Sequence, residues 1–268
     1  MLNVPKGVAL ALASVLSLFV FSSGAGAQAQ AQGGQGRGGQ AKPAETSKEP
    51  FDPHDFTGVW GGASINPLTR EEPPMSAWGL QRYKQAKTNW SNPPVTGADD
   101  NDPVLRCEPA GIPRLYNGFA HPIEFMQAPD KIVQLFEADS IYRIFYLNRQ
   151  HPPHPDELWF GDSIAHWEGN TLVVDTTDFN DRTWLDTWGH PHSNQMHMVE
   201  KFTRINHDQL QDDITIDDPI AYTKTWGGQK TWKLQPKNDE LLEYLCSPSD
   251  EAQVIQKVME PESGPGKK

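Results

Sequence analysis

Histidine is the residue type whose placement most strongly suggests chemistry in this chain of 268 residues. Six of its nine histidines lie between positions 151 and 197, and four of its nine tryptophans fall in nearly the same window. Imidazoles bind metals and exchange protons near neutral pH, and indoles bind flat apolar groups. Loops rich in such residues commonly form a wall of a pocket. The residues are His151, His154, His166, His190, His192, His197, Trp159, Trp167, Trp184 and Trp188.

The segment His190-Pro191-His192 has the spacing of a metal-binding pair. In an extended segment, side chains two positions apart point the same way, so two imidazoles could chelate one ion. His197 would be a third ligand if residues 193–195 turn back. The pattern predicts a transition-metal cofactor, zinc-like, with one position left for water. The alternative is a polar loop whose imidazoles bond backbone carbonyls.

A second histidine pair, His151 and His154, is separated by two prolines and followed by a third. Polyproline II has three residues per turn, which places both imidazoles on one side, about 9 Å apart along the axis. This separation suits binding a ligand from two points, together with Trp159, Trp184 and Trp188. The alternative is a rigid surface turn with solvated histidines.

Two charged residues are expected to face the interior of the fold. Alternation along residues 196–205 puts Glu200 on the same face as Met198 and Phe202, and a similar pattern puts Arg143 beside Phe145. A buried charge must be paired or lie in a cavity. We interpret the two as a structural ion pair, with Arg143 also able to anchor a ligand. The alternative is that Glu200 acts as a general base beside His197.

Composition excludes several classes of partner. There are 23 Lys plus Arg against 35 Asp plus Glu, a formal net charge of −12, with no basic stripe. Such a chain is a poor candidate for binding nucleic acid or an anionic membrane. It also lacks a phosphate-binding glycine loop.

The N-terminus has the form of an export signal. One lysine, Lys6, precedes the apolar stretch from Gly7 to Phe21, and Ala25-Gly26-Ala27 is a small-x-small cleavage site. We therefore predict a signal peptide over residues 1–27, a disordered linker over 28–50, a single domain over 51–260 and a disordered tail over 261–268. The protein is expected to be exported to the periplasm or beyond, with no stable membrane anchor after cleavage. In an oxidising compartment, Cys107 and Cys246 most simply form one disulfide.

The folded part reads as short strands joined by turns, with one helix. Turn-separated runs with alternating or apolar patterning predict an antiparallel up-and-down β-barrel. The helix is expected within residues 73–90, where two prolines precede helix-forming residues. The expected strands cover 55–62, 131–137, 141–147, 161–167, 171–176, 196–205, 209–217, 230–235 and 240–246.

Two resemblances bear on this fold. Gly58-Val59-Trp60 on the first strand resembles the opening of the lipocalin and wider calycin barrels, which implies a Trp closing one barrel end and a cavity for a small, often apolar molecule. Several blocks are also similar to a group of secreted bacterial proteins without an assigned activity, which implies a common domain and extracytoplasmic placement. The blocks are Trp167–Thr176 (WEGNTLVVDT), Phe179-Asn180 to Trp184-Leu185-Asp186, Gly189–Ser193, Glu200-Lys201-Phe202 and Thr215–Pro219.

Three functions remain open on these grounds. The first is an exported, calycin-like barrel that binds a small apolar or aromatic ligand in a pocket lined by Trp and His. The second is a hydrolase or lyase on the same barrel, using the histidine cluster with or without a metal. The third is an envelope interaction protein, which would expose its Trp-rich loops as an apolar patch.

Overall fold

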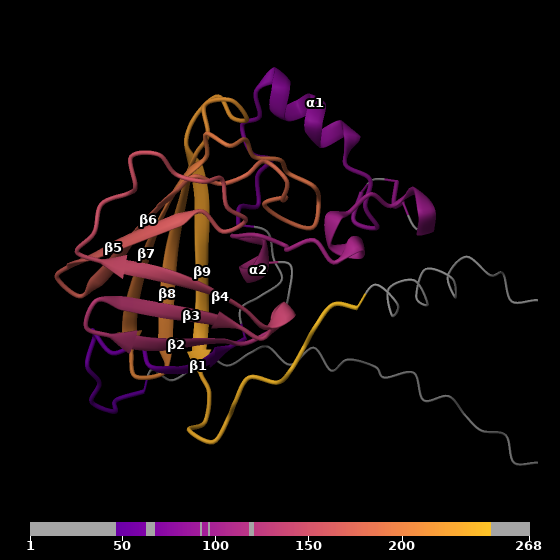
Figure 1. Ribbon diagram of the computed structural model, residues 1–268. Coiled ribbons are helices and arrows are strands. Elements are labelled where there is room, and N and C mark those ends of the chain that lie inside the picture. The colour runs from indigo at the N-terminus through magenta and orange to yellow at the C-terminus, as the bar shows by residue number, and fades with distance from the viewer. Residues whose placement is uncertain (1–46, 63–67, 92, 96, 118–120, 248–268) are drawn as a thin grey trace, which may run out of the picture. The chain divides into compact units, whose positions relative to one another are not determined.

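Nine strands in the described residues close into a β-barrel in chain order (Figure 1). The computed structural model describes residues 47–62, 68–91, 93–95, 97–117 and 121–247. All of them belong to one compact unit. The predicted signal peptide, most of the linker and the C-terminal tail lie outside the described residues. The strands are β1 (Gly58–Gly61), β2 (Ile123–Ala128), β3 (Lys131–Phe136), β4 (Ile141–Leu147), β5 (Asp162–Glu168), β6 (Thr171–Thr177), β7 (His197–Asn206), β8 (Gln209–Asp217) and β9 (Trp226–Leu234).

The barrel is mainly antiparallel, as predicted, but one pair of neighbours is not. Strands β4 and β5 run parallel, with Phe145 opposite Ser163, whereas every other neighbouring pair, including β1 with β9, is antiparallel. A closed ring of nine strands cannot alternate direction throughout, so one parallel pair is unavoidable. Residues 148–161 provide the return connection that a parallel pair needs, and three prolines keep part of it out of the sheet.

The strand boundaries agree closely with the sequence except at three places: β2, the predicted strand over 240–246 and the start of β9. Strand β2 was not predicted, although Ile123 and Phe125 face inward between exposed or half-exposed neighbours. The predicted strand over 240–246 is wrong, because residues 235–247 contain no strand. The ring is already closed by β1 against β9, so no edge remains for a further strand to join.

The last strand begins earlier than predicted because glycine allows close packing there. A Cβ on Gly228 would lie 1.8 Å from the carbonyl oxygen of Leu68, and one on Gly227 would lie 1.9 Å from that of Ile214. Only glycine permits backbone to approach at this distance. Strand β9 therefore starts at Trp226 rather than near Lys230.

Alternation along each strand fills the barrel with aromatic side chains. The rings of Phe125, Phe145 and Trp232 all lie 5.7–6.3 Å from that of Phe202, in the buried core. Trp60, from β1, is fully buried. Its ring lies 5.3 Å from the guanidinium of Arg204, which also donates to the carbonyl of His207 in the β7–β8 turn.

Helices α1 (Ala77–Gln85) and α2 (Arg114–Asn117), with the short 3₁₀ turns η1 (Gly97–Asp99) and η2 (Pro103–Arg106), lie between β1 and β2 in the chain. Helix α1 is shorter than the predicted 73–90. Its N-cap is Ser76, whose side chain accepts from the amide of Gly79 at 3.0 Å, and Ala86 is already extended. A third 3₁₀ turn, η3 (Ala138–Ser140), joins β3 to β4 where a turn was predicted. Figure 1 shows α1 outside the strands, next to the loops at one end of the barrel.

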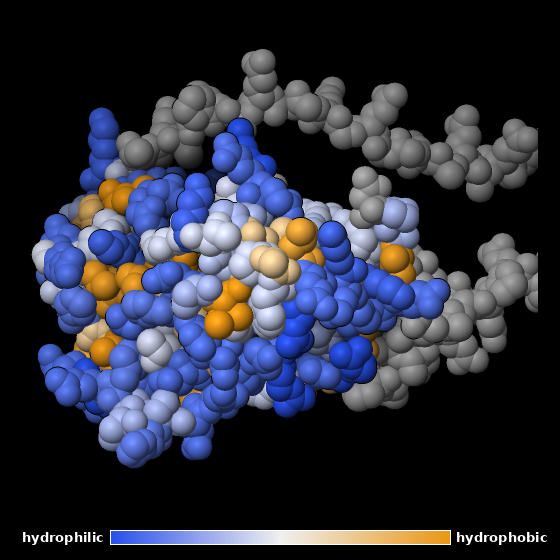
Figure 2. All heavy atoms as spheres, turned by 90° about the horizontal axis from the view of Figure 1, so that it is seen from above, coloured by the Kyte–Doolittle hydropathy of each residue, from blue (hydrophilic) through white to orange (hydrophobic). Residues whose placement is uncertain are grey.

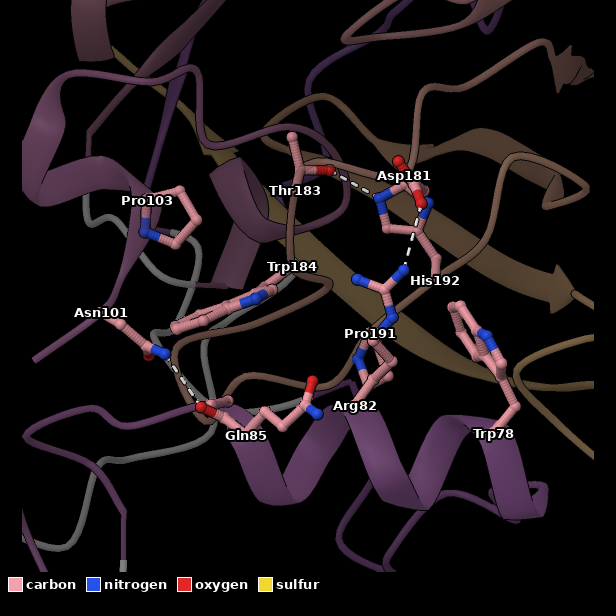
Figure 3. Close-up of a pocket in the computed structure, with 11 residues that line it drawn as sticks. Trp78, Arg82, Gln85, Asn101, Pro103, Asp181, Thr183, Trp184, Pro191 and His192 are labelled. Carbon is pink, nitrogen blue, oxygen red and sulfur yellow. Dashed lines mark hydrogen bonds and ion pairs between the residues drawn. The ribbon is translucent and has the colours of Figure 1, made fainter.

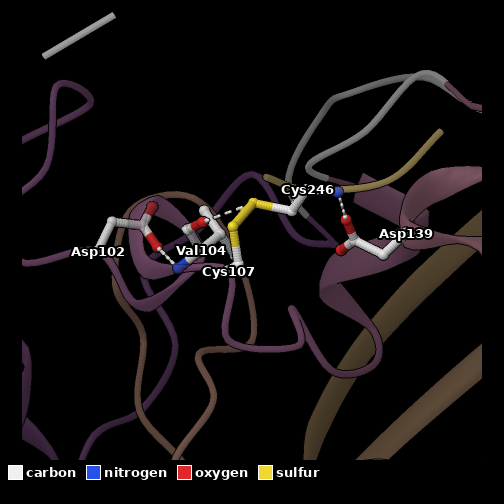
Figure 4. Close-up of a disulfide and its surroundings, with 5 residues drawn as sticks. All are labelled: Asp102, Val104, Cys107, Asp139 and Cys246. Atoms are coloured by element: carbon white, nitrogen blue, oxygen red, sulfur yellow. Dashed lines mark hydrogen bonds between the residues drawn. A yellow bond between two sulfur atoms is a disulfide. The ribbon is translucent and has the colours of Figure 1, made fainter. Parts of the chain in front are cut away.

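The predicted disulfide between Cys107 and Cys246 is present, 139 positions apart (Figure 4). It joins the residue that follows η2 to the segment that follows β9. The amide of Cys246 also donates to the carboxylate of Asp139 in η3, at 3.2 Å. These two links fix the C-terminal segment to the outside of the barrel in place of strand pairing.

Candidate ligand-binding site

The loop between β6 and β7, residues 178–196, contains four of the residues that the sequence predicted for a site: Trp184, Trp188, His190 and His192. It has no helix or strand, and Asp side chains fix its course. One carboxylate oxygen of Asp186 accepts from the amides of Trp188 (3.0 Å) and His190 (3.2 Å). The carboxylate of Asp218 accepts from the amide and hydroxyl of Ser193, at 2.6 and 2.8 Å. Such side chain-to-backbone bonds give a loop one defined conformation.

This loop and helix α1 enclose a pocket of about 200 Å³ (Figure 3). Trp78, Arg82 and Gln85 come from α1, and Trp184 faces them from the loop. Their spacing of three and four positions places these α1 residues on one helical face. The full lining is Trp78, Arg82, Gln85, Ala86, Asn101, Pro103, Asp181, Thr183, Trp184, Pro191 and His192.

Opposite charges in the pocket lie close together. The guanidinium of Arg82 lies 4.9 Å from the ring centre of Trp78 and 3.5 Å from the carboxylate of Asp181. Both charged side chains are about half exposed. Among the described lining residues this is the one ion pair, so the pocket has no net charge when His192 is neutral.

Burial lowers the pKa of His192, which favours the neutral imidazole at neutral pH. Its Nδ1 lies 3.1 Å from the carbonyl oxygen of Ser193, which can only accept, so Nδ1 holds the proton. Its Nε2 is then an acceptor and lies 2.6 Å from the hydroxyl of Thr183. The arrangement is a hydroxyl that donates to a neutral imidazole, with both side chains almost fully buried.

The three histidines predicted as metal ligands are not brought together. His190 bonds Asp186 and Glu72, His192 bonds Thr183 and Ser193, and His197 bonds Asp175. Across the part of the chain that the structure describes, no group of three or more His, Cys, Asp or Glu side chains is arranged to hold a metal ion. The side chains of His190 and His192 have different bonding partners and line different pockets.

Glu200 and Arg143 form an ion pair inside the barrel, as the structural interpretation predicted. Two nitrogens of Arg143 lie 2.5 and 3.1 Å from the two oxygens of Glu200, and both side chains are buried. The hydroxyl of Tyr116, from α2, lies 2.9 Å from Glu200. Burial raises the pKa of Tyr116 well above its ordinary value, which keeps this hydroxyl protonated. Arg143 is therefore enclosed by its own partners and does not reach the pocket of Figure 3.

His197 lies on the opposite face of β7 from Glu200, so the structure does not assemble the predicted acid-base pair. Its Nε2 lies 2.9 Å from Asp175 on the outside of the sheet. That hydrogen bond outweighs partial burial and raises the pKa of His197. The same carboxylate oxygen is 3.1 Å from Nε2 of His151, whose Nδ1 bonds Asp162 at 2.9 Å.

The remaining predicted ligand residues are distributed over three places. His151 holds the 148–161 connection against the outer face of the sheet, and His154 is exposed. Trp159 packs against Arg182 at 4.4 Å. Trp188 lies in a separate pocket with His190. Only Trp184 of this set lines the pocket of Figure 3.

Sequence reasoning missed Trp78, Arg82 and Thr183. The first two had a usable signal, because they lie four positions apart on the one predicted helix. Thr183 had none, since no local pattern relates it to His192, nine positions away, to which its hydroxyl is bonded.

The face of the molecule shown in Figure 2 is mainly hydrophilic, with hydrophobic residues in small separate groups. It does not present the continuous apolar patch that an interaction protein would need on that face. Among the described residues, no helix has the length and apolar character required to cross a membrane. No protein-family model, curated protein or solved structure matches this chain.

Proposed function

We propose that this chain is an exported β-barrel protein that binds a small, neutral, planar aromatic molecule in the pocket of Figure 3. The observation that supports the proposal is the pair of indoles, Trp78 and Trp184, contributed from two separate segments to one concave site. Aromatic walls with a few polar groups are the usual composition of small-molecule sites.

The size of the pocket limits the ligand. Sites for drug-sized ligands usually measure about 300–1,000 Å³, and this one measures about 200 Å³. A single substituted ring or a compact bicyclic molecule therefore fits the proposal better than a fatty acid or a sterol.

The charges in the pocket favour a neutral ligand. Arg82 and Asp181 already face one another, and neutral His192 adds no charge. An anion would gain from Arg82 but would be repelled by Asp181. Gln85, together with the Arg82–Asp181 pair, offers hydrogen bonds to a hydroxyl or ring N–H on the ligand.

In this proposal the ligand binds outside the barrel, which supports the site but does not enclose it. Tyr116 occupies the interior, where it contacts Glu200, Gln134 and the ring of Trp232. The calycin resemblance implied a cavity inside the barrel, whereas the proposed site lies between α1 and the β6–β7 loop.

The direct test is calorimetric titration of the purified protein with indole and phenol. W184A should weaken indole binding at least tenfold, because it removes one aromatic wall. W159A is the matched control, since Trp159 lies outside the pocket, and it should bind as the wild type does. Thermal melting of both variants checks folding. Equal affinity for indole in W184A and W159A would contradict the proposal.

Export is a separate part of the proposal. The disulfide supports it, because such bonds persist in oxidising compartments. In cells that express the full chain, fractionation should recover the protein outside the cytoplasm, beginning at residue 28. Recovery of uncleaved protein in the cytoplasm would contradict it.

One observation favours a catalytic alternative in the same pocket. The hydroxyl of Thr183 donates to neutral His192 at 2.6 Å, the arrangement in which a base can activate a nucleophile. In an ester hydrolase, the Thr183 oxygen would attack the carbonyl while His192 takes its proton and returns it to the leaving alcohol. Water would then release the acyl group by the same route. T183V should abolish turnover of small aryl esters, and T183S should retain it; equal turnover by both variants contradicts this alternative.

A further inference from the structure

A second pocket, of about 230 Å³, lies beside the Asp186–His190 segment. Its apolar lining comes from Leu68, Trp188 and Trp226, and its most buried charged groups are Asp186 and His190. The indole N–H of Trp226 is buried and has no acceptor among the described residues. The pocket therefore has an apolar wall beside two buried charged groups.

The orientation of His190 is fixed from two sides. Its Nδ1 lies 2.6 Å from a carboxylate oxygen of Asp186, and the other oxygen of Asp186 is held by two backbone amides. The ring stacks on Tyr83 from α1, with centres 4.5 Å apart and planes 6° from parallel. An imidazole held in this way presents Nε2 in one direction.

The partner at Nε2 is a carboxylate, that of Glu72, at 3.1 Å. Both ring nitrogens of His190 thus face carboxylate oxygens, which only accept, so the ring bonds both as an imidazolium. Burial alone would lower the pKa of His190, but its bonds to Asp186 and Glu72 outweigh burial and the pKa is raised.

Glu72 is a weak partner compared with Asp186. Its side chain is 60% exposed, whereas those of His190 and Asp186 are 7% and 6% exposed. Holding a long, exposed side chain in place costs entropy, and exposed ion pairs contribute little stability. A carboxylate on a ligand with an apolar tail could bond Nε2 and also bury that tail against Trp188 and Trp226.

We propose that this pocket binds a short monocarboxylate, whose carboxylate displaces that of Glu72 at Nε2 of His190. The side chain of Glu72 is then an internal competitor that resembles the ligand. The pocket volume suits an aliphatic tail of a few carbons. This site is independent of the one between Trp78 and Trp184, and neither proposal requires the other.

The test is calorimetric titration with butyrate, and with butyramide as a neutral molecule of the same shape. E72A should bind butyrate at least tenfold more tightly than the wild type, with no matching gain for butyramide. E71A is the matched control, because it removes the same charge from the same segment without removing a bond to His190. Equal butyrate affinity in E72A and E71A, or an equal gain for butyramide, would overturn the proposal.

A second measurement tests His190 itself in the E72A background. H190Q should lose butyrate binding while its far-UV spectrum and melting remain close to those of E72A. If H190Q does not fold, the pH dependence of E72A decides. Butyrate affinity should fall as the pH rises through the titration of His190. The charged and titratable groups around it in this background are Asp186, Tyr83, and Arg70 and Glu71 of the pocket lining. Affinity that is unchanged by H190Q, or that is independent of pH from 6 to 9, would overturn the proposal.

Discussion

Replacing Arg143 with methionine should destabilise the protein strongly, because the buried carboxylate of Glu200 loses its ion-pair partner. Arg143 donates five hydrogen bonds inside the barrel, two of them to Glu200 and one each to the side chains of Tyr116, Ser163 and Thr176. In R143M, the fully buried carboxylate of Glu200 would keep one of these hydrogen-bond partners, the hydroxyl of Tyr116. Removing one partner of a buried ion pair typically costs about 3–5 kcal/mol, and we expect a loss in this range.

The double variant R143M/E200M should recover most of this loss. The polar groups around the pair still have partners without it: the hydroxyl of Tyr116 lies 3.0 Å from Gln134, and the hydroxyls of Ser163 and Thr176 lie 3.1 Å apart. Replacing a buried ion pair by apolar residues of similar volume is often neutral or stabilising. We therefore expect the double variant to lie within about 2 kcal/mol of the wild type.

Urea denaturation followed by tryptophan fluorescence, with the disulfide intact, gives the free energies for the double-mutant cycle. The exposed pair Arg106 and Glu108, 3.4 Å apart, is the control. R106M should cost less than about 1 kcal/mol, because exposed ion pairs are weak. If the losses in R143M and E200M simply add in the double variant, the two residues are not coupled and the reasoning is refuted.

Three further predictions concern stability. C107A/C246A should lower the free energy of unfolding by about 5 kcal/mol, the chain-entropy value for a loop of this length; a loss below about 1 kcal/mol in urea denaturation would contradict that account. Burial and the charge of Glu200 raise the pKa of Asp212 well above its ordinary value, so the fold favours the protonated acid. D212N should therefore raise the unfolding midpoint at neutral pH, with a gain that shrinks as the pH falls toward 4; a lower midpoint at pH 7 would contradict this. Because the pKa of His190 is raised, its protonated ring stabilises the fold fully below about pH 6.5, and that contribution is lost as the pH rises through the folded pKa. NMR titration of the ring should place this pKa above 6.5, and a lower value would contradict the proposed ion pairs.

The sequence predicted the barrel because alternation is a local property. Met198, Glu200 and Phe202 face inward as their spacing indicates, and the Arg143–Glu200 pair follows from the same reasoning. Alternation does not determine the direction of a strand relative to its neighbour, so the parallel β4–β5 pair was not predicted. The wrong prediction of a strand at 240–246 has a similar cause. Local patterning does not indicate that β1 and β9 pair with each other and close the ring.

The site was predicted less completely, since it depends on contacts between distant segments. The density of Trp and His identified the β6–β7 loop. It did not determine that His190 and His192 would lie in different pockets, because that depends on Asp186, Glu72 and Thr183. Glu72 is 118 positions from His190, and no local pattern relates them.

The barrel closes at strand β1, which pairs with its neighbours over fewer residues than any other strand. It has four residues, with three register pairs to β2 and two to β9, whereas β7 and β8 share nine. Side chains rather than backbone hold it, since Trp60 and Phe56 are fully buried. Amide hydrogens of β1 should therefore exchange with solvent earlier than those of β7 and β8. A pull applied at the N-terminal end would separate this strand first and expose β2 and β9 as open edges, where a second chain could pair.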